Sequence, residues 1–151
     1  MIGSDLVGKR LTRVRRAFYE FQGAVERDEG LVELSFADGT SVYLDVGPDG
    51  ESLRAEMGPW VDPFAPPHDV ENEEYIRLHG KYSAFDVSGE SPYREAVGHQ
   101  VRNVRPMVDE DTSKQCGLVL EFEGIGFKVE VVADELYVTP VDGYQHNSVT
   151  F

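Results

Sequence analysis

The stretch Gly117-Leu118-Val119-Leu120-Glu121-Phe122 is followed by Phe127-Lys128-Val129-Glu130-Val131 and then by Asp134-Glu135-Leu136-Tyr137-Val138. Apolar and polar residues alternate along the first two of these stretches. A period of two is typical of strands that have one face buried and one face in water. The region therefore predicts three consecutive β-strands.

An earlier part of the chain has the same order of segments. Its three stretches are Gly30–Phe36, Ser41–Val46 and Ser52–Ala55. The segments that precede the two sets also match, because Val7–Arg15 and Val97–Arg105 share Val-Gly, a branched residue and Val-Arg at the same spacing. Self-similarity of this kind indicates an internal repeat. We predict repeat 1 over about 6–57, an insertion over about 58–95, repeat 2 over about 96–140 and a C-terminal tail over 141–151.

The alternation also predicts which side chains form the core. We expect one face of each strand to be buried, through Val32, Leu34, Phe36, Val42, Leu44, Val46, Leu118, Leu120, Phe122, Phe127, Val129 and Val131. The opposite, solvent-facing side would carry Glu33, Glu121, Lys128 and Glu130. Hairpin turns are predicted at Asp38-Gly39 and between Gly124 and Gly126, because such turns need positive φ.

Several segments allow two interpretations. The leaders 7–21 and 97–108 have apolar residues at helical spacing, but they lack N-caps and Pro106 interrupts the second, so we expect bulged strands, with a short helix as the alternative. Residues 22–29 and 109–115 are polar and predict loops. In the insertion, residues 69–78 predict a short helix that ends before Gly80, and an irregular strand pair over 75–87 is the alternative. In the tail, 141–144 predicts a hairpin turn, after which Val149 and Phe151 would contact the sheet.

These elements predict a mainly β protein. Neither copy alone can cover its own apolar face, so we expect both to pack on each other as a single domain spanning 1–151. Two antiparallel meanders would form a sandwich or an open barrel, with the short helix between them. The chain is long enough for one substantial core.

Composition restricts the partners. The formal net charge is −14, which disfavours nucleic acid and anionic membranes and favours either basic partners or simple solubility. The single cysteine, Cys116, permits no internal disulfide and is expected to be a packing residue. The N-terminus has no signal-peptide pattern, and no apolar run approaches 18 residues, so a cytoplasmic protein is expected.

Catalytic and metal-binding patterns are weak. His68-Asp69 resembles a ligand pair of phosphohydrolases, but the further His and Asp residues that such sites need are missing. His79, His99 and His146 have no ligand-like spacing, and His99 is expected to be exposed. The sequence has no Gly-x-Ser-x-Gly motif and no phosphate-binding loop before a helix. We predict no catalytic residues, no metal and no cofactor, and an enzyme is the less favoured class.

The insertion is the best candidate for a binding surface. It combines aromatic residues with carboxylates, a mixture suited to recognition of a basic protein. The predicted partner-binding residues are Trp60, Phe64, Asp69, Glu71, Glu73, Glu74, Tyr75 and Tyr82. The alternative is that the aromatic rings of the insertion, which also include Phe85 and Tyr93, close the open end of the β core.

The repeat also carries a family resemblance, through Val7-Gly8-Lys9 with Leu11 and Val14, then Gly30-Leu31 with Phe36 and Asp38-Gly39, and finally Asp134-Glu135-Leu136-Tyr137-Val138. It resembles small, acidic, β-rich bacterial proteins of unknown function, especially from actinobacteria, and is similar to immunity proteins of polymorphic toxin systems. The resemblance covers the two copies and not the insertion. It implies a non-enzymatic protein that masks a basic toxin. The protein is expected to be a monomer, or an edge-paired homodimer if a long strand is left uncovered. The alternatives are a small-molecule-binding module with a pocket between the repeats and a hydrolase-type enzyme.

Overall fold

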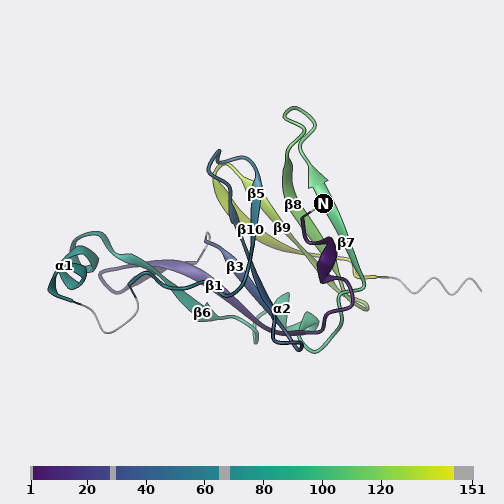
Figure 1. Ribbon diagram of the computed structural model, residues 1–151, viewed down its shortest axis with the longest axis horizontal. Coiled ribbons are helices and arrows are strands. Elements are labelled where there is room, and N and C mark those ends of the chain that lie inside the picture. The colour runs from purple at the N-terminus through teal and green to yellow at the C-terminus, as the bar shows by residue number, and fades with distance from the viewer. Residues whose placement is uncertain (1, 28–29, 65–68, 145–151) are drawn as a thin grey trace, which may run out of the picture.

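The computed structural model of the chain describes residues 2–27, 30–64 and 69–144. Its elements, in chain order, are η1 (Ser4–Leu6), β1 (Leu11–Phe21), β2 (Ala24–Glu26), β3 (Val32–Phe36), β4 (Ser41–Val46), β5 (Leu53–Met57), α1 (Val70–His79), β6 (Lys81–Asp86), α2 (Tyr93–Ala96), β7 (Asn103–Val108), β8 (Gln115–Glu121), β9 (Gly126–Val132) and β10 (Glu135–Val141). The mainly β prediction is confirmed. The described strands form two antiparallel sheets in a sandwich-like arrangement and close no barrel (Figure 1).

Each sheet is built on a four-stranded meander. In the first sheet β1, β3, β4 and β5 are neighbours in that order, and β2 and β6 also pair with β1. In the second sheet the order is β7, β8, β9 and β10. Both meanders therefore follow the order of segments in the sequence repeat.

The two leaders meet each other at the junction of the sheets. Arg10 and Gln100, which the repeat aligns, face each other in an isolated antiparallel bridge. Backbone hydrogen bonds surround this bridge in matched pairs: Gly8 N donates to Val101 O and Gly98 N to Leu11 O, both at 2.7–2.8 Å, while Leu11 N donates to His99 O and Val101 N to Lys9 O. If each position is replaced by the equivalent position in the other copy, the first hydrogen bond of each pair becomes the second. The contact has local twofold pseudosymmetry.

The core lies between the inner faces of the two meanders. The alternating apolar residues predicted to be buried are buried, apart from Val46, which is partly exposed. They join one cluster with Leu6, Leu11, Val14, Phe18 and Leu136. The predicted turns are also present, since Gly39 has φ 86° between β3 and β4, and Gly124 has φ 77° between β8 and β9.

Both leaders are strands, each with one irregularity in register, so the helical alternative for them is wrong. The helix predicted in the insertion is present as α1. The strand-pair alternative over 75–87 is wrong for 75–79, which is helical, but 81–86 is strand β6, which pairs with β1. The loop prediction for 22–29 is wrong in part. Gln22 and Gly23 both have positive φ and form a tight turn, after which β2 folds back on β1.

Two further predictions need correction. Residues 141–144 do not form a hairpin turn, because Tyr144 forms a parallel bridge with Glu123 instead. The predictions for Val149 and Phe151 lie outside the described residues. Glu33 was expected on the solvent face, but its exposure is only 1%. The outer face of β3 at this position is covered by the chain around Trp60.

Candidate functional site

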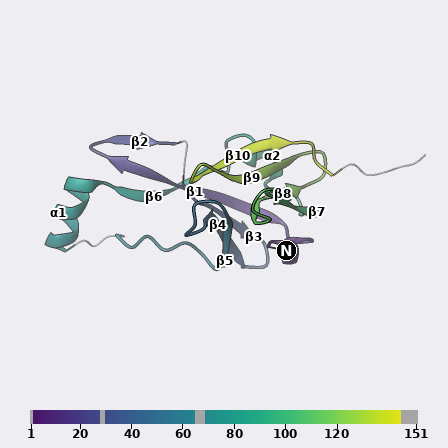
Figure 2. The same ribbon diagram turned by 90° about the horizontal axis from the view of Figure 1, so that it is seen from above.

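An arm extends from one side of the first sheet. Past Arg16, β1 no longer pairs with β3, and its distal half lies between β6 on one edge and β2 on the other. Helix α1 sits at the far end of this ribbon, away from the second sheet, as Figures 1 and 2 show from two directions. The distal part of β1 and β2 in repeat 1, with α1 and β6 of the insertion, therefore build an element that the second copy lacks.

Helix α1 is defined by its caps rather than by packing. The side chain of Asp69 accepts a hydrogen bond from Asn72 N at 2.7 Å, and Gly80 N donates to Ile76 O at the other end. Glu71 and Glu73 lie in the first turn, where negative charge is favoured by the helix dipole. No residue of α1 is buried. The helix thus presents most of its surface to solvent.

Aromatic rings connect α1 to the arm. The rings of Phe64 and Tyr75 stack at 5.3 Å with an interplanar angle of 9°, and His79 contacts the Tyr75 ring at 4.7 Å. Tyr19 on β1 and Tyr82 on β6 pack side by side with ring centroids 5.5 Å apart. These contacts arrange the insertion around an aromatic wall.

The segment before α1 is fixed by charged groups. The carboxylate of Glu33 accepts a hydrogen bond from Trp60 N at 2.8 Å and two more from Arg15, at 2.7 and 2.6 Å. Farther along, the Lys81 ammonium pairs with Asp62 and donates to Phe64 O at 3.3 Å. A chain segment that cannot form regular structure is thereby held at two points.

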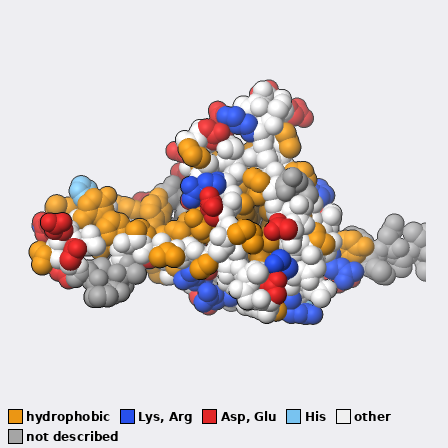
Figure 3. Space-filling model, viewed as in Figure 1, with side chains coloured by type: hydrophobic (Ala, Val, Ile, Leu, Met, Phe, Trp, Pro, Cys, Tyr) orange, Lys and Arg blue, Asp and Glu red, His pale blue; other side chains and the backbone are white. Residues whose placement is uncertain are grey.

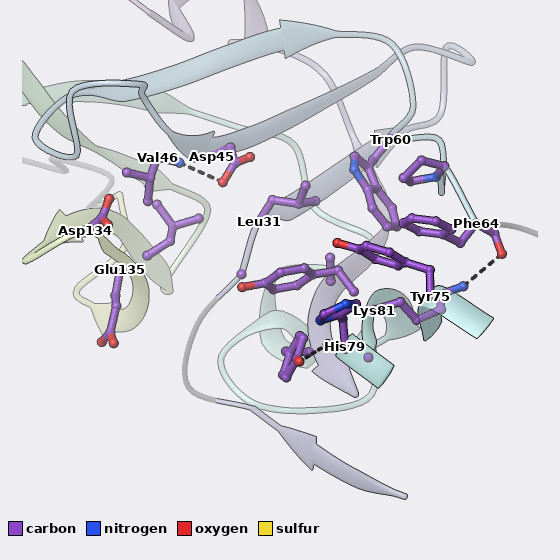
Figure 4. Close-up of a pocket in the computed structure, with 17 residues that line it drawn as sticks. Leu31, Asp45, Val46, Trp60, Phe64, Tyr75, His79, Lys81, Asp134 and Glu135 are labelled. Carbon is purple, nitrogen blue, oxygen red and sulfur yellow. Dashed lines mark hydrogen bonds between the residues drawn. The ribbon is translucent and has the colours of Figure 1, made fainter. Parts of the chain in front are cut away.

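A hollow of about 490 Å³ lies between the arm and the second sheet (Figure 4). This volume is within the range of pockets that bind small organic ligands, roughly 300–1,000 Å³. Its lining is Ala17, Tyr19, Gly30, Leu31, Asp45, Val46, Trp60, Pro63, Phe64, Tyr75, His79, Gly80, Lys81, Tyr82, Asp134, Glu135 and Leu136. Both copies of the repeat contribute to it.

The carboxylates of the hollow differ in environment. Burial raises the pKa of Asp45 above its usual range, and the hydrogen bond from Val46 N and the charge of Arg54 oppose this only in part. Glu135 accepts a hydrogen bond from the Tyr137 hydroxyl. Among the described residues, no Lys, Arg or His nitrogen lies within 4.0 Å of Asp45, Asp134 or Glu135. The hollow therefore has carboxylates without a direct counter-ion.

The structure brings together half of the residues predicted to bind a partner. Trp60, Phe64, Tyr75 and Tyr82 all line the hollow, and none of them is in the buried core. Tyr93 is buried in the core and Phe85 packs against it, so the alternative that the aromatic rings of the insertion close the β core holds only for those two. Asp69, Glu71, Glu73 and Glu74 are exposed on α1 or at its cap and lie outside the lining. Sequence reasoning missed Tyr19, Asp45, the turn residue Asp134 and Glu135 at the start of β10.

The other candidates have structural surroundings. Cys116 is partly buried, and burial raises the pKa of its thiol, which disfavours the reactive thiolate. His99 is exposed as expected, and His68 and His146 lie outside the described residues. Across residues 2–27, 30–64 and 69–144, no group of three or more His, Cys, Asp or Glu side chains could hold a metal ion. No helix in this part of the chain is long and apolar enough to span a membrane.

Comparison with known proteins gives no relative. No family model, no curated protein and no solved structure matches the chain.

Proposed function

We propose that this protein is a binding protein that masks a basic surface of a partner protein, in the manner of an immunity protein acting on a toxin. The observation that carries the proposal is the arm, on which exposed apolar side chains and carboxylates occur together. Figure 3 shows hydrophobic side chains along the arm and acidic side chains gathered at its end.

Helix α1 exposes several large apolar side chains to solvent. Val70 is 81% exposed, Leu78 51% and Tyr75 49%. Met57, Val61 and Tyr82 are also exposed nearby in the sequence. Contiguous exposed apolar surface rimmed by polar groups is typical of protein-binding sites. A ten-residue helix with no buried residue also has little intrinsic stability in water, so a partner that covers it would stabilise it.

The negative charge of α1 and its cap favours a positively charged partner. Asp69, Glu71 and Glu73 are exposed, and Glu74 is the one carboxylate of this cluster that pairs within the helix, with Arg77. The whole chain is strongly acidic. Complementary charge speeds encounter with a basic protein and suppresses binding of acidic ones.

Capture from a lysate of the source organism, at low and at moderate salt, tests the proposal. We expect one basic protein to be retained at both salt concentrations, and its affinity for the purified chain can then be measured by calorimetry. Trp60→Ala, and Glu71→Gln combined with Glu73→Gln, should each weaken binding at least about tenfold, the scale of loss at interface hot spots.

The matched control is Glu110→Gln combined with Asp111→Asn. It removes the same charge from exposed carboxylates on the β7–β8 loop, remote from the arm. Equal weakening by the control and by the α1 variant would mean that only net charge matters, and the arm would then not be the binding surface. Retention of acidic proteins would contradict the proposal altogether.

The second candidate function is a small-molecule-binding module. The observation that favours it is the hollow, since it lies between the two copies and is lined by apolar and aromatic side chains with a few polar groups. A metabolite screen by thermal shift tests it. A rise in melting temperature with one compound, abolished by Trp60→Ala and unaffected by the α1 variant, would favour this function over masking of a protein. The hydrolase-type alternative has no observation in its favour among the described residues.

A further inference from the structure

The hollow has two chemically different ends. Figure 4 shows Trp60, Phe64 and Tyr75 together on one side, and Asp45, Asp134 and Glu135 on the other, with Leu31 between them. A ligand that fills the hollow must therefore satisfy an aromatic wall and an acidic wall at the same time.

The acidic end favours a cation. Asp45 comes from β4, Asp134 from the turn between β9 and β10, and Glu135 from the first position of β10, so the two sheets bring their carboxylates to the same end. Across the strand pair, Asp45 faces Arg54, but the ion pair of that arginine is with Glu56, at 3.7 Å. A partly buried carboxylate without an ion-pair partner is costly to keep charged. A bound ammonium or guanidinium group would supply the missing counter-charge.

The aromatic end favours an apolar or planar side chain. The backbone N–H of Trp60 donates a hydrogen bond to Glu33, and the ring of Phe64 stacks on that of Tyr75, which belongs to α1. Rigid aromatic rings are efficient anchors for apolar and aromatic groups of a partner. The one ammonium group in this wall, Lys81, is already paired with Asp62. An anionic ligand therefore has no free cation to bind there among the described lining residues.

We propose that the hollow binds a short basic segment of the partner protein, in which a Lys or Arg side chain lies next to an apolar or aromatic one. The basic group would lie at Asp45, Asp134 and Glu135, and its neighbour would pack against Trp60 and the Phe64–Tyr75 stack. This inference rests on the proposed function and specifies which part of the partner the protein recognises.

Capped dipeptides test the inference on the full chain by calorimetry. The probe is acetyl-Phe-Arg-amide, and acetyl-Phe-citrulline-amide is its uncharged isostere. Acetyl-Ala-Arg-amide removes only the aromatic group, and arginine amide removes the whole neighbouring residue. We expect the citrulline peptide and the Ala peptide each to bind about tenfold more weakly than the probe, because each lacks one of the two contacts. Arginine amide should be weaker still.

Variants locate the contact. Asp45→Asn keeps the shape of the side chain, removes its charge and should abolish the preference for arginine over citrulline. Glu110→Gln is the control, because it removes one exposed carboxylate from the β7–β8 loop and does not touch the lining. Its preference should remain that of the unmodified protein. Thermal unfolding of each variant checks that the fold is retained.

Several results would overturn the inference. Equal affinity for the arginine and citrulline peptides would remove the acidic end from recognition, and equal loss in Asp45→Asn and Glu110→Gln would do the same. Binding of arginine amide as tight as that of the probe would mean that the hollow takes a free amine rather than a segment. If no dipeptide binds while the basic partner is still captured through α1, this inference fails and the proposed function stands. If the dipeptides bind as expected but no basic protein is captured, the proposed function fails.

Discussion

Replacing Glu33 with Gln should both destabilise the fold and loosen the attachment of the arm. Glu33 is almost fully buried and accepts three hydrogen bonds, two from the Arg15 guanidinium and one from Trp60 N. Removing one partner of a buried ion pair costs about 3–5 kcal/mol. Arg15 is 26% exposed, so water recovers part of this loss and we expect about 2–3 kcal/mol. For a chain of this size, that lowers the melting temperature by roughly 5–10 °C.

The pH dependence of this loss follows from the pKa of Glu33. Burial alone would raise that pKa, but the hydrogen bonds from Arg15 and Trp60 N, with the nearby charges of Arg15 and Arg13, outweigh burial and lower it below the ordinary 4.5. A lowered pKa means that the carboxylate stabilises the fold above the pKa of the unfolded chain, and that this contribution is lost as pH falls through the folded-state pKa. The difference between the unmodified protein and Glu33→Gln should therefore be largest near neutral pH and decrease below about pH 4.5.

Urea unfolding at several pH values measures the effect, and Trp60 fluorescence reports on the arm because it is the only tryptophan. The control is Glu90→Gln, which breaks an exposed pair with Arg27 and should cost at most about 1 kcal/mol. The reasoning is refuted if Glu33→Gln is no more harmful than Glu90→Gln, or if its cost does not change between pH 7 and pH 3. Unchanged Trp60 emission would show that Glu33 does not position the arm.

Three further predictions concern single residues. Arg16 is 6% exposed and donates hydrogen bonds to the Tyr93 hydroxyl, Gly30 O and Leu136 O. Arg16→Met should therefore lower the free energy of unfolding by roughly 1–3 kcal/mol, measured with urea. An unchanged urea midpoint would contradict the view that Arg16 links these three groups. Asp69→Ala removes the cap of α1, worth about 1 kcal/mol, and should speed hydrogen exchange in α1 without changing the melting temperature, because α1 buries no residue. Burial raises the pKa of Asp45 above 3.8, so ionisation there costs stability as pH rises through the folded-state value, and Asp45→Asn should raise the melting temperature at pH 7 but not at pH 3. A variant less stable at pH 7 would mean that Asp45 supports the fold.

The two meanders could be predicted from the sequence, because the alternation of buried and exposed residues along a strand is visible in a short stretch of sequence. Alternation assigned Val32, Leu34 and Phe36 to the core, since each strand buries one face against the other copy. The same rule failed at Glu33, because it assumes that the second face is in water. Here a distant segment covers that face, and one buried carboxylate satisfies both an arginine and the backbone of Trp60. Nothing in the local pattern distinguishes such a residue from an exposed glutamate.

The hollow was only half predictable for a related reason. Its aromatic end comes from one contiguous stretch, so composition alone marked Trp60, Phe64 and Tyr75. Its acidic end joins Asp45 in the first copy to Asp134 and Glu135 in the second, and that juxtaposition depends on how the two sheets pack. In a chain with many carboxylates, no sequence signal singles these three out. Four acidic residues of the predicted site were chosen for their density and lie outside the hollow.

The two copies of the repeat differ in the region of the chain that also contains the candidate site. The leaders contact each other through paired, equivalent hydrogen bonds, and both meanders bury matching residues, so the shared part of the two copies supplies most of the core, to which the insertion adds Val87 and Tyr93. The copies differ where β1 continues to Phe21 while β7 ends at Val108, and where β2, β6 and α1 are added to the longer strand. Strand β6 packs Phe85 against the core, but β2 and α1 bury no residue, so core packing does not explain those two elements. An element that costs chain entropy without adding to the core is best accounted for by what it binds.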